Sequence, residues 1–250
     1  MSTISSPVRL ARPSAVVSPT ITDVERVALQ IPGLSLIADA SERASEFSGI
    51  ALRDRIGARV GQAVGGTSAK INGNPAVSFS GEGAIDVGVH FKYQLPRSYF
   101  IATCVRAVDI ANTSVMVSDA VNNSTSLAFL IMNTGALRLQ HGSANFIAAA
   151  SAVTTLPRTH VLWASYDHLT GDAEIGIDSA TAAARGTIAA EHTGSDGTVV
   201  WGGPSTQWGL NGMGGICAIG DRPFIGDAHQ PHRASILAWL AEYGNVTIAP

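Results

Sequence analysis

HVLWASYDHLTGDAEIGID, residues 160–178, predicts two β-strands joined by a tight turn. Its first half, 161–166, is rich in β-branched, large apolar and aromatic residues, which suit a pleated and partly buried surface. Gly171 can take the positive φ that a hairpin turn needs. In the second half, 173–178, apolar residues alternate with Glu, Gly and Asp, so one face should be apolar and the other polar and solvated. The stretch therefore predicts an antiparallel sheet with one solvent-exposed face.

From residue 34 onward, short apolar stretches alternate with turn signals. The longest of these stretches, residues 99–107 (YFIATCVRA), predicts a buried strand. Asn72-Gly73 is a strong signal for a two-residue hairpin turn. Many short strands separated by turns are typical of a β-sandwich or a β-barrel.

Three stretches carry a resemblance to a known family. They are the hairpin, with its Tyr166-Asp167 and Thr170-Gly171 pairs, residues 72–81 (NGNPAVSFSG) and residues 209–216 (GLNGMGGI). Together they resemble the concanavalin A-like lectin/glucanase superfamily, in its laminin-G or pentraxin-like branch, over residues 32–243. The resemblance implies an all-β antiparallel jelly-roll β-sandwich. It implies little about function, because that fold hosts many functions.

Residues 1–31 differ in composition from the rest of the chain. Three prolines sit among Ser, Ala and Val, which predicts an extended arm. Thr22 and Glu25 form a capping-box pattern that would start a helix of two turns. The apolar residues of this segment favour docking on a partner over a disordered leader. We therefore predict an N-terminal docking arm with a short helix over residues 1–31, and one lectin-like sandwich domain over residues 32–250.

One α-helix is predicted near the end of the sandwich domain, at about residues 232–243 (HRASILAWLAEY). Its apolar stripe consists of Ile236, Leu237, Trp239 and Leu240. Arg233, Glu242 and Tyr243 should form a polar side, and Gly244 is a natural C-cap. We expect this helix to pack across the edge of the sandwich and to be buried within one chain.

The composition excludes some classes of function. The net charge is −3 and no basic stripe is present, so we expect no nucleic-acid partner. No apolar run reaches the roughly 18 residues that span a membrane. The N-terminus has no apolar core of signal-peptide length, so we expect synthesis in the cytoplasm without a secretion signal. Cys104 and Cys217 are expected to be buried thiols, because free Cys is among the most buried residue types.

The glucanase side of the superfamily uses clustered carboxylates on one strand. Here the corresponding strand carries Asp172, Glu174 and Asp178, but Gly176 stands at the middle acidic position. Two carboxylates in defined positions are needed for glycoside hydrolysis. We therefore interpret these acids as a solvated strand face and expect no catalytic residues.

Two other groups of polar residues contain residue types that bind metals. Asp227, His229 and His232 have a loose spacing that fits capping of the following helix, by Asp227 or His232, better than a metal site. The calcium sites of the resembled domains use loop oxygens, which here could come from Asp119, Asn122, Asn123 and Asp196. No spacing assigns such a calcium site. We expect no metal and no cofactor, with a calcium site left unassigned.

A carbohydrate site is predicted around Trp208, with Gln207 and Asn211 beside it. Sugars stack on exposed aromatic rings, and amide side chains hydrogen-bond to their hydroxyls. The alternative is that Trp201 belongs to the core and Trp208 only holds a loop in place.

The first functional hypothesis is a non-enzymatic structural virion protein of a tailed bacteriophage, such as a tail-fibre, receptor-binding or head-decoration component. A lectin-like sandwich, a chain made in the host cytoplasm and a docking arm favour this hypothesis. Its partners would be other virion proteins, a host-surface glycan and further copies of the chain. The alternatives are a bacterial carbohydrate-binding module and a polysaccharide-degrading enzyme of the same fold.

Overall fold

The hairpin predicted over residues 160–178 is present and is formed by β12 (Arg158–Tyr166) and β13 (Asp172–Ile177). In its turn, Gly171 has a φ of 78°, a left-handed conformation that glycine adopts without steric cost. β12 pairs along its whole length with β7 (Tyr99–Ala107), the predicted buried strand. The hairpin therefore continues into a larger antiparallel sheet.

The computed structural model describes residues 22–44, 51–56, 59–79, 88–108, 112–119, 127–153, 156–189, 197–202 and 210–249. The other strands are β1 (Leu34–Ala44), β2 (Ala51–Asp54), β3 (Val60–Val64), β4 (Thr67–Ile71), β5 (Asn74–Phe79), β6 (Gly88–Lys92), β8 (Ser114–Ser118), β9 (Leu127–Ile131), β10 (Leu137–His141), β11 (Phe146–Ala149), β14 (Ala184–Thr187), β15 (Thr198–Trp201) and β16 (Gly212–Gly220). The helices are α1 (Asp23–Leu29), the 3-10 helix η1 (Asp227–His229) and α2 (Gln230–Gly244).

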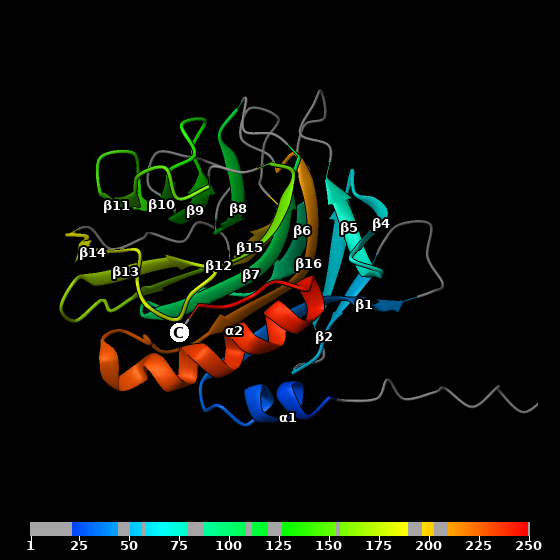
Figure 1. Cartoon of the computed structure of the whole chain (residues 1–250), viewed down its shortest axis with the longest axis horizontal. Coiled ribbons are helices and arrows are strands. Elements are labelled where there is room, and N and C mark those ends of the chain that lie inside the picture. The colour runs from blue at the N-terminus through cyan, green and yellow to red at the C-terminus, as the bar shows by residue number, and fades with distance from the viewer. Residues whose placement is uncertain are drawn as a thin grey trace, which may run out of the picture.

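The strands hydrogen-bond in one continuous path, β11-β10-β9-β8-β15-β6-β3-β2-β1-β16-β7-β12-β13-β14, and the β4–β5 hairpin adds to β16. β11 and β14, at the two ends of this path, contact each other. The sheet therefore folds over itself into two facing layers, as Figure 1 shows. This architecture confirms the predicted antiparallel β-sandwich with one C-terminal α-helix.

Both faces of β7 are buried. Tyr99 and Ile101 face the inner core, which lies between the two layers, whereas Phe100, Ala102 and Cys104 face the opposite side. That opposite side is covered by α2 and forms an outer core. The outer core comprises Ala28, Ile31, Ile37, Phe100, Ala102, Cys104, Val161, Trp163, Ala180, Ile216, Ala218, Phe224, Ile236, Leu237, Trp239, Leu240 and Ala241.

The C-terminal helix packs on the face of the sheet and not across its edge, so that part of the prediction was wrong. α2 contacts β7 and its two neighbours, β12 and β16, which lie inside the strand order (Figure 1). Its apolar stripe is buried within one chain, as expected, with Trp239 4% exposed. Arg233 is fully buried and so does not belong to a polar side. No helix in the described residues is long and apolar enough to cross a membrane.

The two cysteines are buried free thiols, as predicted, and lie on neighbouring strands. Cys104 faces the outer core and Cys217 the inner core, so the sheet separates them. Burial raises the pKa of the Cys104 thiol to about 12, with a further contribution from the charge of Asp178. Burial also raises the pKa of Cys217. Both thiols therefore stay protonated and unreactive near neutral pH.

The predicted helix after Thr22 is α1, and the Thr22 hydroxyl accepts a hydrogen bond from the Glu25 amide at 3.2 Å. α1 lies beside α2 (Figure 1) and contributes Ala28 to the outer core, which Ile31 also joins. Glu25 is buried and forms an ion pair with Arg55. Residues 1–21 of the predicted arm lie outside the described residues, so the division at residue 31 stays a prediction.

Replacement of Trp239 by Ala should destabilise the isolated monomer by about 3–5 kcal/mol, because it leaves a cavity in the outer core. The measurement is the free energy of unfolding in denaturant, at a concentration where the protein is monomeric. Val27→Ala is the matched control, since Val27 is 53% exposed on α1, and it should change stability by about 0.5 kcal/mol or less. Equal stability of Trp239→Ala and wild type would contradict the packing described here.

Candidate functional site

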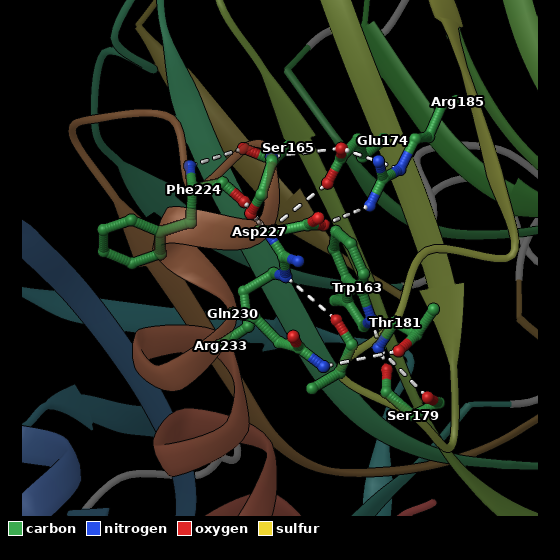
Figure 2. Close-up of polar contacts among 12 residues, drawn as sticks. Trp163, Ser165, Glu174, Ser179, Thr181, Arg185, Phe224, Asp227, Gln230 and Arg233 are labelled. Carbon is green, nitrogen blue, oxygen red and sulfur yellow. Dashed lines mark hydrogen bonds and ion pairs between the residues drawn. The ribbon is translucent and has the colours of Figure 1, made fainter. Parts of the chain in front are cut away.

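Glu174, on the predicted carboxylate face of β13, is buried, so the expectation of a solvated strand face was wrong for this residue. Glu174 is 2% exposed. Its Oε1 lies 3.1 Å from Nε of Arg185 and accepts a hydrogen bond from the Gly226 amide, also at 3.1 Å. Its Oε2 lies 3.4 Å from Nη1 of Arg233. As Figure 2 shows, the segment that precedes α2, together with its first turn, lies over this face of the hairpin.

Arg233 links three segments beneath α2. Its guanidinium donates hydrogen bonds to the carbonyl oxygens of Ala180 at 3.0 Å, Phe224 at 2.6 Å and Gly226 at 2.9 Å. It also lies over the ring of Trp163, with Cζ 4.9 Å from the ring centroid. Burial lowers the pKa of Arg233, and the charge of Glu174 opposes this change. The buried Arg–Glu ion pair and the three carbonyl contacts hold these segments together and serve the fold.

The other acids of β13 do not join Glu174 in one cluster. Trp163 occupies the space into which a side chain at position 176 would project, which explains why Gly176 is required there. Asp172 is exposed in the turn. Asp178 accepts hydrogen bonds from Nδ1 of His160 at 2.7 Å and from the Val161 amide at 2.8 Å. Neither Asp172 nor Asp178 is therefore grouped with Glu174, and the carboxylate that shares Arg185 with it is Asp227, from the segment ahead of α2.

The candidate ligands ahead of α2 have structural contacts. Asp227 pairs with Arg185 at 3.1 Å, and His229 occupies the N-cap position of α2 without a side-chain cap. The predicted capping by Asp227 or His232 was therefore wrong. Asp119 is buried and accepts a hydrogen bond from the Leu127 amide at 2.8 Å. Across the described part of the chain, no three His, Cys, Asp or Glu residues form a potential metal site.

Three of the four possible calcium ligands, Asn122, Asn123 and Asp196, lie outside the described residues. Their role stays untested.

The predicted carbohydrate site is only partly described. Gln207 and Trp208 lie outside the described residues, so their role stays a prediction. Asn211 is half-buried directly before β16, and its carbonyl accepts a hydrogen bond from the Val108 amide at 2.9 Å. Trp201 is buried in the inner core, as the alternative predicted, and its indole donates to the Thr103 hydroxyl at 3.1 Å.

A different site lies at the same end of the sheet as Asn211, where β7 ends, β12 begins and α2 ends. It is a cavity of about 310 Å³, here named the C-terminal pocket. The residues that line it are Asn72, Arg106, Pro157, Arg158, Thr159, Asn245, Val246 and Thr247. Its volume is at the lower end of the range for small-ligand sites, roughly 300–1,000 Å³.

The C-terminal pocket depends on the junction between the β4–β5 turn and the end of α2. Asn72 has a φ of 49° and Gly73 a φ of 87°, as in the tight turn that this pair predicts. The amide of Asn72 donates to the carbonyl of Gly244, and that of Asn74 donates to the carbonyl of Tyr243 at 2.6 Å. These bonds satisfy carbonyls that a helix end leaves unpaired.

The last residues of α2 also differ from the prediction. The left-handed C-cap is Asn245, with a φ of 50°, and not Gly244. Gly244 is the last helical residue and lies close to Cys104 and Thr159, which leaves no room for a side chain. The chain then turns so that Asn245, Val246 and Thr247 line the pocket.

The charged groups of the C-terminal pocket are both cationic. Arg106, at the end of β7, is half-buried and has no ion pair within the described part of the chain. Arg158, at the start of β12, is 54% exposed, and its Nη2 lies 3.9 Å from Oδ2 of Asp178. That carboxylate already accepts two shorter hydrogen bonds, so the pocket keeps an excess of positive charge.

The remaining groups of the pocket are amides, hydroxyls and short apolar surfaces, which suit a small polar ligand. No carboxylate, imidazole or thiol is among the eight lining residues. Sequence reasoning missed Arg106 and Arg158. The signal was Arg106, the one charged residue in the predicted buried strand at residues 99–107 (YFIATCVRA). A charged side chain has no role in a hydrophobic core.

Comparisons with known proteins bear on the fold. No protein-family model matches the chain, and no curated protein matches by sequence. Domain 4 of AbnA, an extracellular arabinanase from Geobacillus stearothermophilus solved with arabinotriose, has a TM-score of 0.61 at 14% identity, over 80% of this chain and 99% of that one.

Two further structures are similar. Trypanosoma rangeli sialidase, solved with sialic acid, has a TM-score of 0.56 at 11% identity, over 85% of this chain but 33% of the sialidase. The heptameric SAP-like pentraxin of Limulus polyphemus has a TM-score of 0.50 at 14% identity, over 64% and 81%. At these identities the likeness concerns the fold alone. The chain therefore has the lectin-like jelly-roll sandwich that the sequence resemblance predicted.

Glu174→Gln should destabilise the protein by about 3–5 kcal/mol, because it leaves the buried charge of Arg233 without its partner. Asp172→Asn removes one carboxylate from the exposed end of the same strand and should cost about 0.5 kcal/mol or less. Chemical denaturation of the two variants and the wild type measures both effects. Equal stability of the two variants would show that the Glu174 contacts do not hold the helix segment.

Proposed function

We propose that this chain is a non-enzymatic lectin-like protein that binds carbohydrate through the C-terminal pocket. The observation that carries the proposal is a polar cavity of about 310 Å³, rich in hydrogen-bond donors, at one end of a lectin-like jelly roll. Asparagine amides, threonine hydroxyls and guanidinium groups are the partners that sugar hydroxyls require.

One of the similar structures supports the proposal, since the arabinanase domain, matched over 99% of its length, was solved with arabinotriose. The absence of turnover is part of the same proposal. Glu174, the best acidic candidate on the hairpin, is engaged by two arginines and a backbone amide.

The finer proposal is that the chain is a virion protein of a tailed bacteriophage, in which residues 1–21 attach the sandwich to the particle. Its support is the proline-rich, apolar composition of that segment. α1 holds the start of the described chain against the sandwich, so an arm that precedes it would be anchored on a rigid body. The alternative, a bacterial carbohydrate-binding module, is favoured by the match over 99% of the arabinanase domain.

Carbohydrate binding is tested with a panel of neutral and acidic oligosaccharides, by glycan array and then by calorimetry. We expect at least one oligosaccharide to bind the wild type, and Thr247→Trp to abolish its binding because the indole fills the pocket. Leu169→Trp is the control, since Leu169 is 81% exposed beyond the opposite end of β12. No reducing ends should be released from the panel. Binding to no oligosaccharide, or binding that Thr247→Trp leaves intact, would refute the proposal.

The virion role is tested by deletion of residues 1–21, because a longer deletion would remove Ala28 and Ile31 from the outer core. We expect the truncated protein to melt within a few degrees of the full chain but to be lost from purified particles. Mass spectrometry of particles measures incorporation. Normal incorporation of the truncated chain would contradict the role of the arm. The proposal of carbohydrate binding would be unaffected by that result.

A further inference from the structure

We infer that the C-terminal pocket selects acidic sugars, and that Arg106 and Arg158 bind the sugar carboxylate. This inference rests on the proposed function and names its ligand class. Arg106 and Arg158 line a cavity whose other residues carry no charge. Arg106 lacks an ion pair within the described residues, and Arg158 has only a long contact, at 3.9 Å, with Asp178. A half-buried arginine without a carboxylate partner keeps its charge and donors available to an anionic ligand.

The backbone of Arg106 is held on both sides. It pairs with Met213 of β16 and with Thr159 of β12, so its strand is in the interior of the layer. Gly212 packs directly against the carbonyl of Arg106, where a side chain would not fit. The backbone that carries Arg106 is therefore held in place beside the pocket, which favours recognition of a ligand there.

The end of α2 does not cancel this positive charge. A helix C-terminus carries partial negative charge, which would oppose an anion. Here the Asn72 and Asn74 amides satisfy the carbonyls of Gly244 and Tyr243, and the amide of Val246 satisfies the Ala241 carbonyl at 2.9 Å. The pocket therefore presents donors and cations.

The chemistry of the lining favours a sugar acid over a simple anion. An arginine fork matches the planar carboxylate with two parallel hydrogen bonds. Around the arginines, Asn72 and Asn245 offer amides, and Thr159 and Thr247 offer hydroxyls, which suit the hydroxyl groups of a sugar ring. A uronic acid or a sialic acid unit carries both features.

The test compares trigalacturonic acid and sialyllactose with their methyl esters, which have nearly the same shape and no charge. Calorimetry with the full-length protein should show at least one free acid binding roughly ten- to a hundredfold more tightly than its ester, the range expected for a charge-assisted hydrogen bond. Arg106→Gln should remove this preference, and Arg106→Lys should restore part of it. Sodium phosphate alone should bind far more weakly than the preferred acid.

Arg222→Gln is the matched control. Arg222 is half-exposed just beyond the opposite end of β16 from the pocket, and its loss changes the net charge by the same amount. It should leave the preference for the acid unchanged, and melting curves check that all variants are folded. Equal binding of acids and esters, or a preference that Arg106→Gln leaves intact, overturns the inference while carbohydrate binding stands. Phosphate binding as tight as that of the sugar acid would show a general anion site and also overturn it. If neither acids, esters nor neutral oligosaccharides bind, the proposed function itself fails.

Discussion

The buried contact between Arg233 and Glu174 joins the parts of this molecule that lie outside the β-sandwich. A guanidinium without solvent must have all its charge and donors satisfied, because the desolvation of an ion costs several kcal/mol. Arg233 forms an ion pair with one carboxylate from β13, and its Nε and Nη1 donate hydrogen bonds to three carbonyls from two different segments. The start of α2 can therefore occupy only one position on the sheet. The helix, the segment after β16 and the hairpin are fixed together by this one side chain.

With its first turn fixed, α2 covers a face of the sheet that would otherwise expose Phe100, Trp163 and Ile216. This cover explains why both faces of β7 are apolar. In a sandwich with one wet face, alternate residues of such a strand would be polar. Here both faces of β7 are buried, and Cys104 lies beneath α2, away from solvent. α1 extends the same cover through Ala28.

The opposite end of α2 builds the C-terminal pocket. The Asn72 and Asn74 side chains bind the last helical carbonyls, and this places the β4–β5 turn beside the ends of β7 and β12. Four segments distant in sequence thus meet around Arg106 and Arg158. α2 therefore both covers the sheet and supplies one wall of the C-terminal pocket. The stability of the fold and the shape of the pocket depend on the same contacts between the β4–β5 turn and the end of α2.

The sequence by itself determined the central hairpin, the buried strand at residues 99–107 and the existence of the last helix, because alternation, turn residues and helical spacing are local properties of the chain. Residues 99–107 and the Asn72-Gly73 turn were predicted with their observed bounds. The burial of Glu174 and Arg233 was decided only by the tertiary structure. Within its own element, each of the two residues has the sequence pattern of a surface residue. Neither the sequence of β13 nor that of α2 shows that the other element supplies an oppositely charged partner. The pocket could not be predicted for the same reason: its residues lie on four segments, and only the packing of α2 on the sheet brings them together.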